Sequence, residues 1–415
     1  MSVKKQKPKA VIVGGSIAGV SSAKALILAD WDVVVLEKQC APPTRSPTGA
    51  GLALDPVSQK VIQSWLHQPE LLHSVTLPLK IDQKQGTDKQ KKVSWILARD
   101  ENSNLRSAYW ADLHGLLYNT LPLPVEMFLW GHQYLSFCVS ENKTSVKVQA
   151  KVLETDETVE IIGDLLVAAD GLRSSIRQTW RGVIDFSEME NSETIKGIRK
   201  AYPDLGKCLY MDLNSESHMV LVELMYKRFN WVWYVNQPEP KLKDNTATIK
   251  VSSEMIRAMH QEVKKAWVPE LARLVEETKE PFINVIYDCD PLTQIFWDKV
   301  VLVGDAAHPT TPHYARSTNM AILDAAVLGK CLEKWQGAEN LQCALEEYQS
   351  IRLPVTSKQV LCSRKLGRIE QGLSVVPDGE PFDPKTASPE DCQVLLQRSV
   401  PHFAEVPSIL GFGYT

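Results

Sequence analysis

The sequence lacks the features that would point to a membrane, a secreted or a nucleic-acid-binding protein. No apolar run approaches the roughly 18–20 residues that a membrane-spanning helix needs. The first apolar strand begins by Ala10, so neither a signal peptide nor a transit peptide is expected. The formal net charge is −4, which argues against a nucleic-acid partner because such a partner requires a basic face.

Paired metal or disulfide motifs are also missing. The eight cysteines are scattered singly with no C-x-x-C pair, which is typical of reduced thiols and predicts a cytoplasmic protein. Neither zinc-ligand spacing nor a nucleophile elbow occurs. His308 and His313 are close to Asp305 and would allow a metal site, but their position in a longer motif described below explains them better. We therefore expect no metal.

Residues 9–38 contain a strand, a glycine turn, a helix, a second strand and an acid in that order. The strand, helix and second strand are expected at residues 10–13, 20–29 and 32–36. Glycines in the turn would let backbone amides approach a pyrophosphate, and Glu37 suits a ribose 2′-hydroxyl. The segment thus predicts an adenine dinucleotide bound by Gly14, Gly15, Ser16, Ala18, Gly19, Glu37 and Lys38.

The rest of the chain predicts a mixed α/β protein. Alternating apolar residues predict antiparallel strands over 134–160 and a hairpin in the runs MVLVELM and NWVWYV, whereas helices are expected over 110–117, 256–277, 318–335 and 340–372. At 415 residues the chain is too long for one ordinary core. We expect a discontinuous nucleotide-binding domain of residues 1–75, 105–180 and 285–375, a sheet domain of residues 76–104 and 181–284, and a C-terminal tail of residues 376–415.

Two further segments extend the glycine turn into a larger pattern. They read AADGLRSSIR at residues 168–177 and VVLVGDAAHPTTPHYARSTNMAILDA at residues 300–325. With the glycine turn, they resemble the class A flavoprotein monooxygenases, the family with the p-hydroxybenzoate hydroxylase fold, and TTPH and RSTNM are similar to some plant members. The resemblance implies a Rossmann-like FAD-binding domain, an inserted antiparallel-sheet substrate domain and C-terminal helices.

The resemblance also implies how FAD would be held. Asp305 would accept a hydrogen bond from a ribityl hydroxyl, Gly304 would keep the backbone close, and the helix after Arg316 would point its N-terminus at the flavin ring. Asp170 and Gly171, with Arg173 beside them, would bind the flavin and help to receive the nicotinamide. The other expected cofactor contacts are Arg45, Gly51, Pro312, Ala315, Ser317 and Asn319.

Some of these positions have other interpretations. Arg45 is equally well explained as an exposed loop residue, and Arg177, the last residue of the AADGLRSSIR segment, as a member of a surface ion pair. Asp305 has the lesser alternative of a helix cap.

The family's chemistry belongs to the flavin. NADPH or NADH would reduce the ring as a transient co-substrate, and O2 would add to form a C4a-hydroperoxide that hydroxylates or epoxidises a small aromatic or conjugated substrate. No side chain is expected to act as a catalytic nucleophile. Trp231, Trp233 and Tyr234 are candidates to line the substrate pocket, although sheet core is the stronger interpretation.

Two departures from the family pattern allow other functions. Ala315 and Ser317 replace glycines where the backbone would approach the flavin. Only two residues separate Arg177 from Trp180, which predicts a shortened or missing strand and an exposed sheet edge. The alternatives are a flavin-binding protein with impaired or no turnover, and a flavin reductase or dehydrogenase on the same scaffold.

Overall fold

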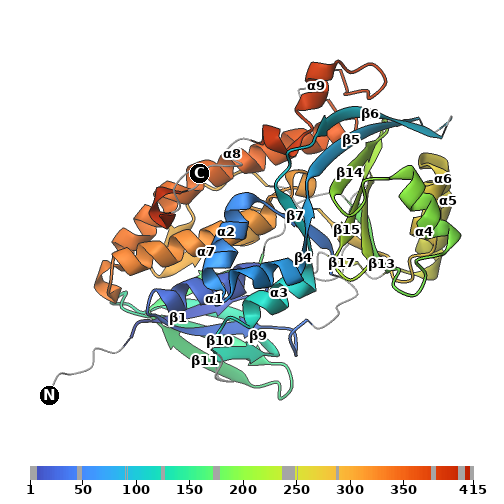
Figure 1. The fold of residues 1–415 in the computed structure, drawn as a ribbon. Helices are drawn as coiled ribbons and strands as arrows, with labels where there is room; N and C mark the ends of the chain where they lie inside the picture. The colour runs from blue at the N-terminus through green and yellow to red at the C-terminus, as the bar shows by residue number, and fades with distance from the viewer. Residues whose placement is uncertain are drawn as a thin grey trace.

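Two large sheets organise the chain (Figure 1). The computed structural model describes residues 7–43, 49–88, 90, 92–122, 127–171, 178–235, 248–249, 251–286, 289–374, 380–400 and 407–411. A six-stranded sheet has the order β19-β20-β12-β1-β2-β8, and an eight-stranded sheet has the order β17-β18-β13-β16-β15-β14-β5-β6. The long helix α8 (Leu341–Glu370) packs on the first sheet's core through Leu345 and reaches the second sheet through Leu366.

The six-stranded sheet is parallel except at one edge, where β19 is antiparallel. Its strands are β1 (Lys9–Val13), β2 (Asp32–Glu37), β8 (Phe128–Trp130), β12 (Leu165–Ala168), β19 (Phe296–Trp297) and β20 (Val300–Leu302). Ile12 faces a core formed with α1 (Ile17–Leu28) and α7 (Ser317–Lys334), whereas Val11 faces the opposite side. That opposite side is covered by a three-stranded sheet of β9 (His132–Val139), β10 (Val146–Val152) and β11 (Thr158–Gly163). Burial on both faces explains the continuous apolar runs of these strands.

The eight-stranded sheet is antiparallel apart from the β14–β5 pair. It contains β5 (Ile81–Asp88), β6 (Val93–Asp100), β13 (Gln178–Asp185), β14 (Cys208–Leu213), β15 (Ser217–Leu224), β16 (Arg228–Val235), β17 (Thr248–Ile249) and β18 (Phe282–Val285). Helices α4 (Glu193–Ala201), α5 (Ser253–Ala266) and α6 (Pro269–Glu276) cover its outer face (Figure 1). The fold class expected from the sequence, a Rossmann-like domain with an inserted sheet and C-terminal helices, is confirmed.

Short elements connect the two sheets. A small antiparallel sheet contains β3 (Gly51–Leu54), β4 (Thr76–Leu79) and β7 (Leu105–Tyr109). Along the chain, α2 (Pro56–Trp65) and η1 (Pro69–Ser74) lie between β3 and β4, and α3 (Trp110–Tyr118) follows β7. The remaining elements are η3 (Gly304–Ala306), η4 (Pro312–Tyr314), η5 (Ala338–Asn340), α9 (Pro389–Gln393), η6 (Gln397–Ser399) and η7 (Ser408–Leu410). The C-terminal tail is not separate from the fold, because Leu396 packs on Ala98 and Gln397 N–H donates to Asp82 at 2.8 Å.

The strand at Trp180 differs from the sequence expectation. Trp180 lies inside β13, which pairs with β16 along eight residues and with β18 along four. The strand is therefore internal, and the predicted exposed edge at this place is wrong. The reason is that the residues following Arg177 themselves form the strand. We propose that the sheet domain resumes at residue 178 rather than 181.

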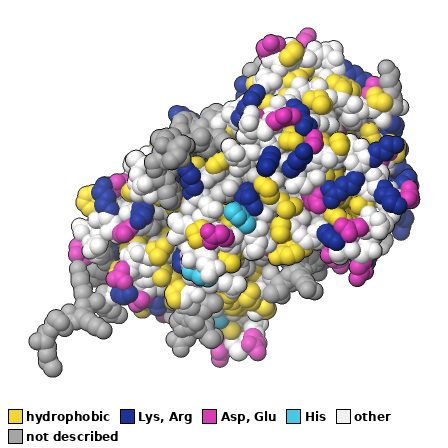
Figure 2. All heavy atoms as spheres, viewed as in Figure 1, with side chains coloured by type: hydrophobic (Ala, Val, Ile, Leu, Met, Phe, Trp, Pro, Cys, Tyr) yellow, Lys and Arg dark blue, Asp and Glu magenta, His cyan; other side chains and the backbone are white. Residues whose placement is uncertain are grey.

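The surface of the described residues is mixed in charge. Lysine and arginine side chains are interspersed with aspartate and glutamate over the face in Figure 2. Ion pairs of the described residues include Lys227–Glu190 at 2.9 Å and Lys334–Glu347 at 2.8 Å. None of the helices in the described ranges combines the length and apolar character that a bilayer span needs.

Candidate functional site

The glycine turn lies at the carboxyl end of β1. Gly14 has φ +102°, and a Cβ there would lie 2.5 Å from the carbonyl oxygen of Ala169, so only glycine lets the turn lie against the chain that follows β12. Ser16 is exposed at the start of α1, its side chain makes no capping hydrogen bond within the described residues, and the first turn carries no acidic residue. The exposed helix start therefore presents a partial positive charge suited to an anion.

Glu37 lies beside this turn at the end of β2. Its carboxylate accepts hydrogen bonds from Gly15 N–H at 2.7 Å and from Gln39 N–H at 2.8 Å. His114 of α3 supports the other side, where its Nε2 lies 2.7 Å from the Gly15 carbonyl oxygen. Burial lowers the pKa of His114, so the ring is neutral near pH 7 and donates through Nε2. Sequence reasoning placed His114 on a helix but gave it no role.

The second turn follows β12 and adjoins the first. Ala169 N–H donates to the Val13 carbonyl at 2.9 Å, and Asp170 and Gly171, the latter with φ +75°, come next. Asp170 is exposed, yet protein atoms around its carboxyl raise its pKa, an effect that the exposed Lys38 opposes. Three other predicted or candidate arginines, Arg45, Arg173 and Arg177, lie outside the described residues.

The third turn follows β20 and closes on α1 and α7. Gly304 has φ +60°, and a Cβ there would lie 2.9 Å from the Ala18 side chain. Asp305 is exposed between two buried residues, and its Oδ1 accepts a hydrogen bond from Ser317 Oγ at 2.6 Å. Surrounding protein atoms raise the pKa of Asp305, and the Ser317 bond opposes that rise. The three predicted turns therefore meet at one edge of the sheet.

A buried ion cluster supports the third turn. Asp324 of α7 accepts from Gly304 N–H at 2.8 Å, from Arg352 Nε of α8 at 2.8 Å and from His308 Nε2. Burial alone would raise the pKa of Asp324, but His308 and Arg352 outweigh it and hold that pKa below its usual range. Sequence reasoning missed this cluster, although a lone acid inside the apolar run of α7 was a usable signal.

The segment before α7 is held by buried polar side chains. Asn319 donates to the carbonyls of Ala53 at 2.8 Å and Ala315 at 2.7 Å, and its oxygen accepts from Asp55 N–H at 2.9 Å. Arg316 forms a buried ion pair with Asp55 at 2.6 Å. Both amide protons of Asn319 are thus used by the protein, so this side chain positions the segment.

Three other predicted contacts lie where the small sheet and η4 face the eight-stranded sheet. Gly51 N–H donates to the Asn230 side chain of β16 at 2.8 Å. Pro312 opens η4, and Ala315 ends it with a left-handed backbone at φ +52°. The conformation that glycine normally supplies is therefore kept despite the methyl group.

The three aromatic pocket candidates divide between the two faces of β16. Trp231 and Trp233 are buried in the core under α4, α5 and α6, and Trp231 Nε1 donates to Thr278 at 2.8 Å. Tyr234 points the other way, toward η4, where its ring centroid lies 5.1 Å from that of His313. Because side chains alternate along a strand, residues 231 and 233 cannot share a face with 234. The core interpretation therefore holds for both tryptophans, and the pocket prediction for them is wrong.

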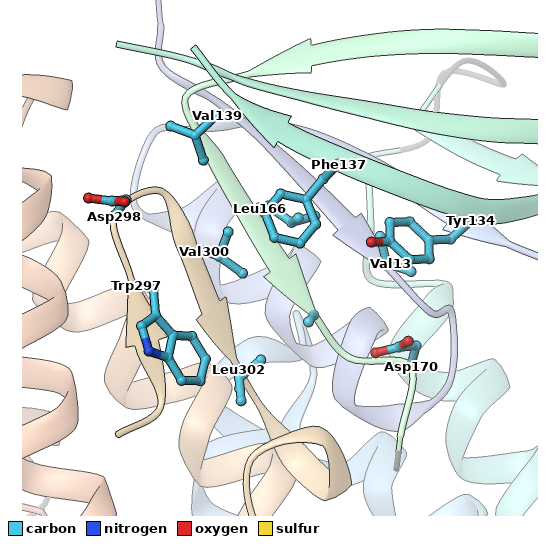
Figure 3. A pocket seen from close by; sticks show the side chains of 11 residues that line it. Val13, Tyr134, Phe137, Val139, Leu166, Asp170, Trp297, Asp298, Val300 and Leu302 are labelled. Carbon is cyan, nitrogen blue, oxygen red and sulfur yellow. The ribbon is translucent and has the colours of Figure 1, made fainter. Parts of the chain in front are cut away.

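A separate apolar pocket of about 290 Å³ lies on the opposite face of the six-stranded sheet. Figure 3 shows Phe137 and Val139 reaching from β9 toward Leu166 and Val300, with Trp297 at one side. The core formed with α1 and α7 lies across the sheet. This pocket is therefore distinct from the edge where the three turns meet, apart from Asp170 at its rim.

Comparison with known proteins identifies the family. Residues 123–363 match the family described as FAD binding domain. The chain belongs to this family. It is 25% identical over 365 residues to 6-hydroxynicotinate 3-monooxygenase of Pseudomonas fluorescens, covering 85% of this chain and 89% of the relative. It is also 25% identical over 378 residues to salicylate hydroxylase of Pseudomonas putida, covering 83% and 81%.

A solved structure is similar over most of this chain. A Klebsiella pneumoniae protein crystallised with FAD and uric acid superposes with a TM-score of 0.70 at 20% identity, over 88% of this chain and 89% of that one. The family match and the two relatives make this chain a member of the class A flavoprotein monooxygenases, with FAD as its cofactor. The likeness to plant members stays a prediction.

Proposed function

We propose that this protein is an FAD-dependent monooxygenase that uses NADPH or NADH and O2 to hydroxylate or epoxidise a small aromatic or conjugated substrate. The meeting of three turns at one sheet edge is the observation that supports it best. Gly14 contacts the chain at Asp170, and Gly304 contacts Ala18, so distant segments line one continuous surface. A long cofactor with separate adenosine and flavin ends suits such a surface.

Each turn has a role in holding FAD. We place the pyrophosphate at the exposed start of α1 and the adenosine ribose near Glu37, with Lys38 beside it. Asp305 and Ser317 form one hydrogen-bonded unit that would meet the ribityl chain. Bound FAD supplies hydride acceptance from NAD(P)H and oxygen activation. The protein's part is to position both reactants and to exclude water.

The substrate would bind between η4 and the inner face of the eight-stranded sheet. Val220 and Val232 share this face with Tyr234, because their registers on β15 and β16 coincide. Arg181 of β13 pairs in register with Val232 and so points to the same face. A guanidinium among apolar side chains favours an aromatic substrate that carries an acidic group. The two named relatives, which act on hydroxynicotinate and salicylate, make such acids the first candidates.

Steady-state assays with the purified flavoprotein test this function. We expect NAD(P)H oxidation and O2 uptake to rise with a hydroxylatable aromatic acid and to yield stoichiometric product with little peroxide. Arg181→Met should raise KM for aromatic acids more than it lowers kcat. Peroxide formation with every aromatic tested would instead support the reductase alternative. The internal position of β13 removes one of the two reasons for expecting impaired turnover.

We also propose a cytoplasmic location. None of the eight cysteines, all within the described residues, forms a disulfide. Cysteines that form no disulfide are typical of a chain of this size in a reducing compartment. Fractionation of cells that express the tagged protein would test the proposal.

A further inference from the structure

Two imidazoles and a carboxylate converge where α8 meets the eight-stranded sheet. His218 lies on β15, His313 in η4, and Glu370 is the last residue of α8. One ligand atom of each lies within 4.8 Å of the others. His218 and Glu370 are fully buried, and His313 is 3% exposed. Segments far apart in the sequence thus bring three metal-ligating side chains together.

Packing fixes the two imidazole rings. His218 stacks on Tyr234 with ring centroids 4.0 Å apart, and His313 lies 5.3 Å from His218. A Cβ at Gly367 of α8 would lie within 2.4 Å of His313 Cε1, so the glycine makes room for the ring against the helix. The rings are therefore held in place without a bound ion.

Within the described part of the chain, few hydrogen bonds or charges offset the cost of burying the Glu370 carboxylate. Its Oε2 lies 3.5 Å from His218 Nε2, too far for a hydrogen bond, and neither oxygen accepts a hydrogen bond from a described residue. Lys84 is near enough to affect Glu370 but forms its own buried ion pair with Asp82 at 2.9 Å. Burying a carboxylate that accepts no hydrogen bond is costly, and a cation removes that cost.

We propose that His218, His313 and Glu370 bind a divalent transition-metal cation of the Zn²⁺ class. Imidazole nitrogens with one carboxylate oxygen form a donor set that suits this class. Ligands at about 2.0–2.2 Å from a tetrahedral zinc lie roughly 3.5 Å apart, so small side-chain movements from the observed spacing complete the site. The ion would tie η4 and α8 to β15, a structural role that does not depend on the proposed oxygenation.

Metal analysis of the holoprotein tests the site. Protein stripped with a chelator and titrated with Zn²⁺ is expected to take up one equivalent per chain. His218→Asn and Glu370→Gln should each weaken binding by about tenfold or more, because each removes one ligand. His73→Ala, a change at an exposed histidine of η1, should leave binding unchanged.

A second measurement separates this site from the flavin. Co²⁺ in place of Zn²⁺ should add ligand-field absorption at wavelengths beyond the flavin bands, and Glu370→Gln should abolish it while flavin absorbance is retained. Zn²⁺ should also raise the Tm of wild-type protein but not that of Glu370→Gln. Substoichiometric Zn²⁺, or equal binding by wild type and Glu370→Gln, would overturn the proposal. Failure of the monooxygenase assay alone would leave it intact.

Discussion

At the residue scale, Ala315 adopts a backbone that glycine adopts at lower cost. Its φ of +52° is left-handed, a region in which a Cβ costs on the order of 1 kcal/mol. We therefore predict that Ala315→Gly raises the free energy of unfolding by about 1 kcal/mol, measured by urea denaturation of the FAD-saturated protein.

The matched control is Ala307→Gly, at a right-handed position with φ −89° just after η3. Here glycine adds freedom to the unfolded chain and removes a methyl group buried in the core, so the free energy of unfolding should fall by about 1–2 kcal/mol. Equal losses in both variants would show that the methyl of Ala315 contributes packing worth more than the strain.

Asp212 is a second residue whose effect on stability can be measured, in this case through its dependence on pH. It is fully buried on β14, burial raises its pKa to about 6, and Gln85 donates to it at 2.9 Å. Because this folded-state pKa lies above the unfolded value, wild-type stability is lost as pH rises from about 4 to 6. Asp212→Asn avoids that loss. Between pH 4 and pH 7 its free energy of unfolding should therefore rise by on the order of 2–3 kcal/mol relative to that of the wild type.

Thermal unfolding across pH measures this difference, and Asp204→Asn supplies a control of opposite sign. Arg99 and Lys207 lower the pKa of Asp204, so its removal should matter most at neutral pH and least in acid. A constant offset between Asp212→Asn and wild type would rule out the titration of Asp212.

At the element scale, the Asp324 cluster ties α7 and α8 to the turn after β20. Asp324→Asn leaves Arg352 buried without its anionic partner, which typically costs about 3–5 kcal/mol. We predict a loss of that order and weaker FAD retention, because Gly304 N–H loses its charged acceptor. Denaturation and flavin release on dilution measure the two effects.

The control for this cluster is an ion pair on the exposed side of the same helix. Glu333→Gln removes the contact with Lys330 at 2.7 Å, three residues away, and should change stability by less than about 0.5 kcal/mol. If Asp324→Asn behaves like Glu333→Gln, the cluster does not hold the turn.

Elements that depend on local pattern were predictable from the sequence. The helix expected over 318–335 is α7 at Ser317–Lys334, and the glycine turn follows its strand as expected. The helix expected over 256–277 is instead two, because Trp267 is extended before Pro269, which begins α6. Pairing across the chain was not predictable, since no local signal brings His218 to Glu370 or places β13 inside the sheet.

At the whole-molecule scale, one cofactor should stabilise segments that are almost 300 residues apart. The surface that we propose for FAD uses the turns at Gly14, Asp170 and Gly304, which lie close together only in the folded chain, so FAD binding would stabilise the folded state alone. FAD at about 100 times its Kd should stabilise the protein by about 2.7 kcal/mol and raise the Tm accordingly.

The adenosine end is the part of this cofactor that the glycine turn and Glu37 would hold. FMN, which lacks that end, should therefore raise the Tm much less than FAD at equal concentration. Glu37→Gln keeps the size of the side chain but makes it a weaker hydrogen-bond acceptor for Gly15 N–H and for a ribose hydroxyl. The substitution should therefore narrow the gap between the Tm increase caused by FAD and that caused by FMN. Differential scanning fluorimetry with both flavins measures the gap. An unchanged gap in Glu37→Gln would mean that the adenosine end is held by groups other than this carboxylate.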